Sequence, residues 1–190
     1  MKSLFEFDEE IEESLWILAD GGFLLLETEN DYYIGCDATN SKSVKILQKN
    51  TEFFKAFKAI LVNSMAMLIR YVDDVPEVAY DLSENVSSTI TMIFPKAKNL
   101  NKDILLKNNR IAITITFNNF FKILISTYKK PLFYKKIKKF HNENLNDFYC
   151  FNSKNYQIKK IITQIPSESQ LIKFNSDNTY VNLKKLSLTF

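Results

Sequence analysis

The chain has 190 residues, of which 46% are hydrophobic and 14% aromatic, so it can bury a core and is not a disordered polymer. Its net charge of +3 conceals two unlike halves. Residues 1–96 carry 8 basic and 17 acidic side chains (net −9), and residues 97–190 carry 17 basic and 5 acidic ones (net +12). This asymmetry is typical of a protein in which one part contacts a polyanion.

Several classes of protein are excluded by the same sequence. No apolar run reaches the length of a membrane-spanning helix, and the N-terminus has no signal-peptide core. Two separate cysteines make no zinc framework, and three glycines cannot build a phosphate-binding loop. The single histidine, His141, has no nucleophile at a recognisable spacing. We therefore expect an intracellular, soluble protein (nuclear if eukaryotic) with no catalytic residues, no metal and no cofactor.

The first half is predicted to consist mainly of strands. Residues 5–14 indicate at most a helical turn, and Asp20-Gly21-Gly22 is typical of a hairpin turn. Thr51 is a suitable N-cap for a helix over residues 52–61, because Phe53, Phe57 and Ile60 fall on one helical face. The predicted strands cover residues 14–19, 23–28, 32–37, 43–47, 66–72, 76–82 and 89–94.

The second half follows a polar linker at residues 96–103, which is the predicted domain boundary. A helix is expected at 117–127, and strands at 110–116, 132–140, 147–151, 156–165, 170–174 and 179–188. The sequence thus predicts an α+β protein, β-rich and antiparallel with few short helices. Its two domains would be an acidic one at 1–96 and a basic one at 97–190.

The stretch DDVPEVAYDLSENVSSTITMIFPK, residues 73–96, resembles the sliding-clamp family, both its replicative and its checkpoint members. In that family an Asp-Val-Pro turn leads to a last strand that ends in a proline and a basic residue. Asp74-Val75-Pro76 and Phe94-Pro95-Lys96 stand at that separation. The resemblance covers about residues 11–96, and residues 97–190 would be a degenerate second clamp-like domain.

The resemblance implies a non-enzymatic platform for DNA replication or repair. Subunits of such a ring join edge to edge, here through residues 89–94 or 43–47, and partners dock on the outer face. Carried over by position, Lys49, Lys55, Lys58 and Lys122 would contact DNA phosphates without sequence preference. The partner-binding pocket would contain Val75, Pro76, Met92 and Phe94.

A basic cluster interleaved with aromatic residues lies further along the chain. Lysines neutralise phosphates, and aromatic rings can stack on unpaired bases, although lysines also protect exposed edge strands. The cluster contains Lys129, Lys130, Lys135, Lys136, Lys138 and Lys139. Two further interpretations stay open, namely a basic non-specific nucleic-acid-binding protein, for instance a viral one, and a structural subunit of a larger complex.

Overall fold

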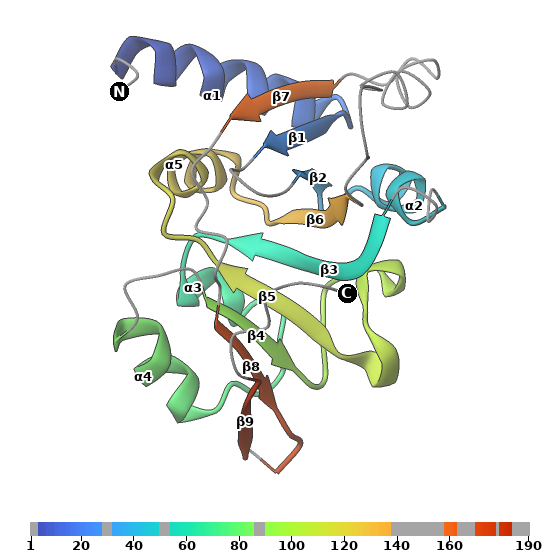
Figure 1. Cartoon of the computed structure of the whole chain (residues 1–190), viewed down its shortest axis with the longest axis vertical. Helices are drawn as coiled ribbons and strands as arrows, with labels where there is room; N and C mark the ends of the chain where they lie inside the picture. The colour runs from blue at the N-terminus through green and yellow to red at the C-terminus, as the bar shows by residue number, and fades with distance from the viewer. Residues whose placement is uncertain are drawn as a thin grey trace.

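A computed structural model gives the fold (Figure 1) and describes residues 4–27, 32–49, 54–85, 90–137, 158–162, 170–177 and 179–183. Its strands are β1 Phe23–Glu27, β2 Tyr32–Asp37, β3 Phe54–Val62, β4 Ile90–Phe94, β5 Ile111–Ile115, β6 Leu132–Ile137, β7 Ile158–Ile162, β8 Gln170–Phe174 and β9 Tyr180–Leu183. Its helices are α1 Leu4–Ala19, α2 Ser41–Lys49, α3 Met65–Leu68, α4 Glu77–Asn85 and α5 Asn119–Tyr128, with 3₁₀ turns η2 Lys102–Ile104 and η3 Lys107–Asn109.

The nine described strands form one mixed sheet in the order β7-β1-β2-β6-β3-β5-β4-β8-β9. Pairs β1–β7, β3–β5 and β4–β8 are parallel and the others antiparallel. The α+β prediction is compatible with this fold in its coarse form, but the antiparallel, clamp-like form is wrong. Strands from both halves alternate in the sheet, so residue 96 does not coincide with a break in its hydrogen bonding. The division into domains stays a prediction.

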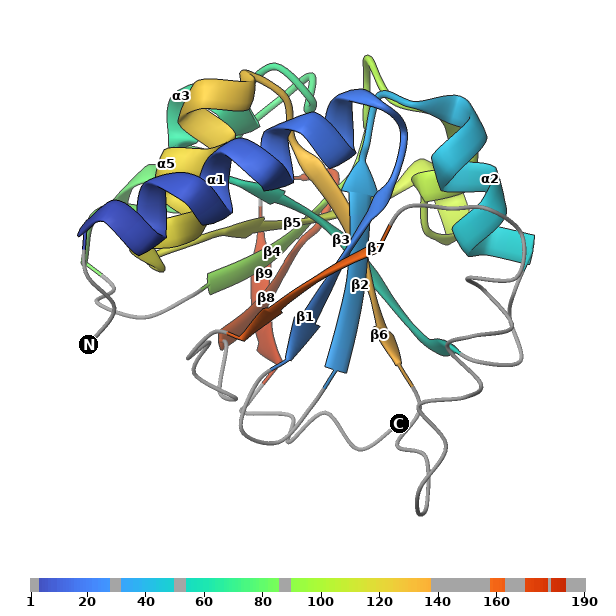
Figure 2. The same ribbon diagram turned by 90° about the horizontal axis from the view of Figure 1, so that it is seen from above.

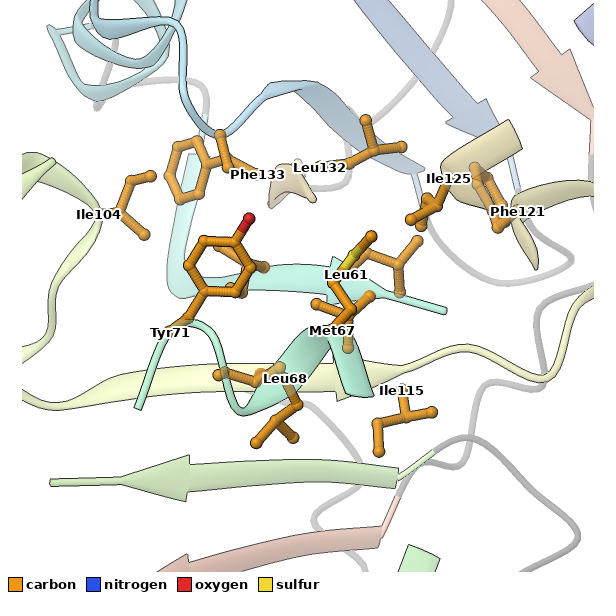
Figure 3. Close-up of a cluster of buried hydrophobic side chains, with 14 of the residues drawn as sticks. Leu61, Met67, Leu68, Tyr71, Ile104, Ile115, Phe121, Ile125, Leu132 and Phe133 are labelled. Carbon is orange, nitrogen blue, oxygen red and sulfur yellow. The ribbon is translucent and has the colours of Figure 1, made fainter. Parts of the chain in front are cut away.

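The sheet is strongly twisted, and helices pack on both of its faces (Figure 2). Both views place α5 and α2 on opposite sides of β2 and β6. Figure 3 shows how one region of the core is closed: Phe121 and Ile125 of α5 lie around Leu132, and Leu68 of α3 lies near Ile115. All five of these side chains are buried. No helix among the described residues is both long and apolar enough to cross a membrane.

Helix α1 replaces the predicted strand at 14–19. Its buried residues Ile11, Ser14, Ile17 and Leu18 recur every three or four positions, which is the helical period. The Asp20-Gly21-Gly22 turn ends this helix instead of closing a hairpin. Gly22 N–H donates to Ile17 O (2.8 Å) and Gly21 N–H to Leu18 O (3.1 Å), the pattern of a Schellman C-cap. Gly21 has φ +79°, the left-handed conformation that this cap needs.

Four other predicted elements of the first half are wrong. Residues 43–47 belong to α2, which Asn40 caps by accepting from Lys42 N–H (3.0 Å) and Ser43 N–H (3.2 Å). Residues 66–72 form α3 and a turn, and residues 76–82 fall mostly in α4, where Pro76 stands just before the first helical residue. Of the predicted helix at 52–61, residues 54–61 belong to β3, a central strand whose residues 59–62 are buried without alternation, and residues 52–53 lie outside the described residues.

The remaining predicted elements are confirmed to within a few residues, as far as the structure describes them. β1, β2, β4, β5, β6, β7, β8, β9 and α5 all occur where the sequence indicated. The predicted strand at 147–151 and terminal residues of five others (28, 89, 138–140, 156–157 with 163–165, and 184–188) lie outside the described residues.

Candidate functional site

A line of polar side chains crosses one face of the sheet, and we call it the polar strip: Tyr33, Lys136, Tyr134, Thr114 and Thr91. The pairing registers place these side chains on one face, because Tyr33 opposes Lys136 and Thr91 opposes Thr114. Tyr134 opposes Ala59 of β3, whose side chain is a single methyl group. The small residue lets the Tyr134 phenol reach across β3 to β5.

Three hydroxyls of the polar strip form a hydrogen-bonded chain. Tyr134 Oη lies 2.6 Å from Thr114 Oγ1, which lies 2.8 Å from Thr91 Oγ1. Both threonines are buried. Burial raises the pKa of the Tyr134 phenol to about 12, partly opposed by its hydrogen bonds with the two threonines. Tyr134 is therefore neutral at physiological pH and can donate or accept a hydrogen bond.

A cation and an aromatic ring lie at the other end of the polar strip. Lys136 Nζ lies 6.0 Å from the centroid of the Tyr33 ring, which meets the Tyr134 ring edge-on at 5.8 Å between centroids. Lys136 is buried at 3% exposure. Gly35 opposes Tyr134, and a Cβ there would lie 3.3 Å from Phe133 O. A charge, an aromatic ring and hydroxyls thus lie together on one face of the sheet.

The opposite face of β3 and β6 carries a pair of lysines. Lys58 and Lys135 oppose one another in register. Lys135 Nζ donates to Leu47 O at the end of α2 (3.5 Å), and Lys58 Nζ donates to Asp103 O in η2 (2.9 Å). Burial, and then the Lys58 charge, lower the pKa of Lys135 to about 8. Both lysines thus donate to backbone carbonyls of α2 and η2, and this role is structural.

Asp37 anchors the end of β2 to α5. Its carboxylate accepts from Thr39 N–H and Oγ1 (both 2.7 Å), Tyr128 Oη (2.8 Å) and Lys130 Nζ (3.0 Å). Burial opposes its ionisation, but the hydrogen bonds from Thr39, Lys130 and Tyr128 together lower the pKa of Asp37. Among the described residues, no group of three or more His, Cys, Asp or Glu side chains could hold a metal ion.

The predicted nucleic-acid contacts are spread over several elements. Lys49 is exposed at the end of α2, and Lys58 is half-buried. Lys122 Nζ lies 4.9 Å from the centroid of Phe117, and Lys129 is exposed at the C-cap of α5. Lys130 pairs with Asp37, and Lys135 and Lys136 are buried on opposite faces of the sheet. The Lys55 side chain, Lys138 and Lys139 lie outside the described residues.

The four predicted partner-binding residues lie near the core. Val75 is half-buried and Pro76 buried. Met92 and Phe94 have 0% exposure, and Phe94 stacks on Phe174 with 4.9 Å between ring centroids. The roles that the sequence suggested for these residues, in contacts with nucleic acid and with partners, stay predictions.

Sequence reasoning missed Tyr33, Thr91 and Thr114. A local signal for the two threonines was present, since each is a single hydroxyl residue within an apolar strand, ITMIF and IAITI. What joins them to Tyr134 is the sheet order, which no local pattern shows.

The Sua5/YciO/YrdC family, described as telomere recombination, matches residues 16–170. The chain belongs to this family. The threonylcarbamoyl-AMP synthase of Pseudoalteromonas translucida (strain TAC 125) is a curated relative, 29% identical over 119 residues. That match covers 60% of this chain but 64% of the relative, which is less than two thirds of its length.

Several solved structures share the fold. Escherichia coli YciO has a TM-score of 0.71 at 16% identity, over 93% of this chain and 89% of that one. Sua5 of P. abyssi, complexed with L-threonine, has a TM-score of 0.67 at 15% identity, over 86% of this chain and 50% of that one. HypF in a phosphate- and nucleotide-bound form has a TM-score of 0.63 at 13% identity, over 88% of this chain and 27% of that one.

Membership of the Sua5/YciO/YrdC family corrects the sliding-clamp interpretation. The clamp resemblance, the replication and repair role, and the DNA and clamp-subunit partners are wrong, and the two alternative interpretations do not fit the family either. The geometry agrees: β4 lies between β5 and β8, and residues 43–47 are helical, so neither predicted edge strand exists. The enzyme name of the curated relative conflicts with the prediction of no activity.

Proposed function

We propose that this chain binds ATP and L-threonine on the polar strip and, with bicarbonate as the source of the carbamoyl carbon, forms threonylcarbamoyl-AMP, an activated intermediate for tRNA modification, with release of pyrophosphate and water. Support comes from the curated relative, which is named for this product, and from the similar structures solved with L-threonine and with a nucleotide. The observation that carries the proposal is the buried Lys136 beside Tyr33 and the hydroxyl chain, on the face opposite to α2.

The polar strip has the chemistry that these ligands need. A lysine ammonium neutralises phosphate charge, and an aromatic ring can stack on a purine. The neutral Tyr134 phenol and the threonine hydroxyls can each donate or accept, as a threonine hydroxyl or a ribose requires. Tyr134 keeps its proton at neutral pH, so we expect it to contact these ligands by hydrogen bonding and not by proton transfer.

The test measures binding and turnover with two matched lysine variants. Lys136→Met removes the charge of the polar strip, whereas Lys135→Met removes the charge of its neighbour on the opposite face of the same strand. Losing a charged hydrogen bond of about 1.5–3 kcal/mol should weaken ATP binding by Lys136→Met about 10- to 100-fold. Lys135→Met should bind ATP as the parent does.

ATP affinity is measured by isothermal titration, and turnover by pyrophosphate release with ATP, L-threonine and bicarbonate, with the product identified by mass. Weaker binding by Lys135→Met and not by Lys136→Met would move the site to the other face. If the parent chain bound neither ATP nor L-threonine, the proposed function would be wrong.

A further inference from the structure

The outer side of helix α1 carries the most exposed large hydrophobic side chain among the described residues. Trp16 is 61% exposed, and the next largest fraction is 48%, for Tyr180. Figure 2 shows α1 along the outside of the molecule, beside α5. The two helices are joined by a hydrogen bond from Tyr128 Oη to Leu18 O (3.1 Å).

The Trp16 side chain leaves α1 on the side away from the core. At 3.6 residues per turn, the buried residues Ile11, Ser14 and Leu18 lie roughly 140–160° around the helix from Trp16. A packed tryptophan buries about 150–250 Å², so the exposed part of this indole leaves on the order of 100 Å² of its surface in water. The packing of α1 on the sheet and on α5 therefore does not account for a tryptophan at this position.

Four carboxylates stand on the same side of α1 as the indole. Glu9, Glu12 and Glu13 are exposed and lie within about 60° of Trp16 around the helix, in the two turns before it. Asp20 is exposed one turn after it, since its N–H donates to Trp16 O (3.0 Å) as in a helix. We call these five residues the Trp16 face. At 1.5 Å per residue it extends over roughly 16 Å.

The negative charge of the Trp16 face is left largely uncompensated. Glu9, Glu12 and Asp20 form no ion pair with any residue that the structure describes, where Asp37 and Asp73 are paired instead. Like charges three and four positions apart destabilise a helix, and Glu9 stands at these separations from Glu12 and from the exposed Glu13. A cationic group placed on this face would remove the repulsion.

The indole and the carboxylates favour the same chemical group. A guanidinium stacks on the face of an indole, the best aromatic ring for a cation, and it pairs with a carboxylate through two parallel hydrogen bonds. Nucleic acids and anionic membranes carry the same sign of charge as the face, so they would be repelled. A metal ion is not favoured either, because no group of three or more acidic, His or Cys side chains among the described residues could hold one.

We propose that the Trp16 face docks an arginine-rich segment of a protein partner. One arginine stacks on Trp16, and arginines one helical turn to either side pair with Glu12 and Asp20. An aromatic anchor with a charged rim is the arrangement that carries most of the affinity in protein interfaces. The proposal does not rest on the proposed function, since no residue of the polar strip belongs to α1.

The test uses Trp16 as its own reporter, because it is the single tryptophan of the chain. The probe is an alanine-based peptide with arginines three and four positions apart. Two control peptides carry lysine or glutamine at the same positions. Affinity is measured by the anisotropy of fluorescein-labelled peptides, and contact with the face by the emission of Trp16 with unlabelled ones. The arginine peptide should change this emission and bind several-fold more tightly than the lysine peptide, and the glutamine peptide should not bind.

Three variants of the full chain locate the contact. Trp16→Ala removes the anchor, and the face variant removes charge through Glu9→Gln, Glu12→Gln and Asp20→Asn. The control variant loses the same charge from the exposed side of α4, which also carries an exposed aromatic residue, Tyr80, through Glu77→Gln, Asp81→Asn and Glu84→Gln. Trp16→Ala and the face variant should each bind the arginine peptide about tenfold or more weakly, and the control variant should bind as the parent does.

The unfolding midpoint of Trp16→Ala should stay the same or rise, because alanine is the better helix former and the indole is not packed. Lower stability of Trp16→Ala with unchanged peptide binding would assign the indole a structural role and overturn the proposal. Absence of binding by the parent, or equal binding by the parent and the face variant, would overturn it too. An emission change on concentrating the chain alone, reversed by salt, would identify a second copy of the chain as the occupant and not an arginine-rich partner.

Discussion

Lys135 is a residue whose charge opposes folding at neutral pH. It is 5% exposed, and burial together with Lys58 lowers its pKa to about 8. An unfolded lysine has a pKa near 10.4, so between these values the unfolded chain binds more protons than the folded one. The stability contributed by this position therefore rises as pH increases from about 8 to about 10.

We expect Lys135→Met to raise the free energy of unfolding at pH 7 by roughly 2 kcal/mol and to flatten its rise with pH. Urea denaturation at intervals between pH 7 and 9.5 measures both effects. Lys136→Met serves as the comparison on the opposite face. A parent chain whose stability does not change over this range would show that the Lys135 ammonium is better solvated or paired than its burial indicates.

Asp37 has the opposite dependence on pH. Its pKa is lowered in the folded state, so its stabilisation is complete above the unfolded value, near 3.9, and is lost as pH falls further. Asp37→Asn should lose about 1–3 kcal/mol at pH 7, since the hydrogen bonds to a carboxylate are replaced by weaker ones to an amide.

The matched control for Asp37 is Asp73→Asn, which breaks the exposed pair with Lys98. Exposed pairs contribute little, so its unfolding free energy should change by less than about 1 kcal/mol. Chemical denaturation at pH 7 and again below pH 4 checks both variants. Equal losses for Asp37→Asn and Asp73→Asn would mean that the Asp37 network does not hold β2 to α5.

At the scale of elements, the end of α1 depends on one backbone conformation. Gly21 adopts φ +79°, and an added Cβ would lie 3.0 Å from Asn40 Nδ2 and 3.4 Å from Ser43 Oγ. Gly21→Ala should cost about 1–2 kcal/mol, from the left-handed strain of a residue with a Cβ. Gly21→Asn should cost less, because asparagine tolerates this conformation. Equal denaturation midpoints for the two variants would contradict the Schellman cap as the source of the loss.

The elements around this cap illustrate where the prediction of helices and strands succeeded and where it failed. Strands β1 and β2 were predictable because short apolar runs are bounded by turn residues at both ends. The run SLWILA has this appearance too, but it is the apolar end of a helix whose first part is acidic, and its burial follows the helical period. β3 was read as a helix because a central strand buried on both faces does not alternate, and its apolar residues also satisfy helical spacing.

The polar strip could not be predicted from the sequence, because only the order of strands in the sheet brings its residues together. Thr91 and Thr114 are neighbours in register on β4 and β5, but Tyr134 joins them across β3, which precedes all three in the sequence. The charge contrast between the two halves led to the prediction of two separate domains. In the sheet, β6 of the basic half lies between β2 and β3 of the acidic half.

At the scale of the whole molecule, this interleaving determines what residues 1–96 can do alone. A fragment ending at 96 keeps β1 to β4, but among the described pairings only β1–β2 survives. β3 pairs with β5 and β6, and β4 with β5 and β8, all of which the fragment lacks. Ile60, Met92 and Phe94, each fully buried in the whole chain, would lose strands beside them.

We therefore expect the fragment 1–96 to show no cooperative thermal transition by circular dichroism and little dispersion of its amide proton resonances. The full chain, measured under the same conditions, should show both. Mixing the fragment with residues 97–190 should restore the transition if the two parts reassemble the sheet, because β5 and β6 then regain their partners. A cooperative transition in the fragment alone would show instead that residue 96 separates two folding units, and the single sheet would be an assembly of two domains.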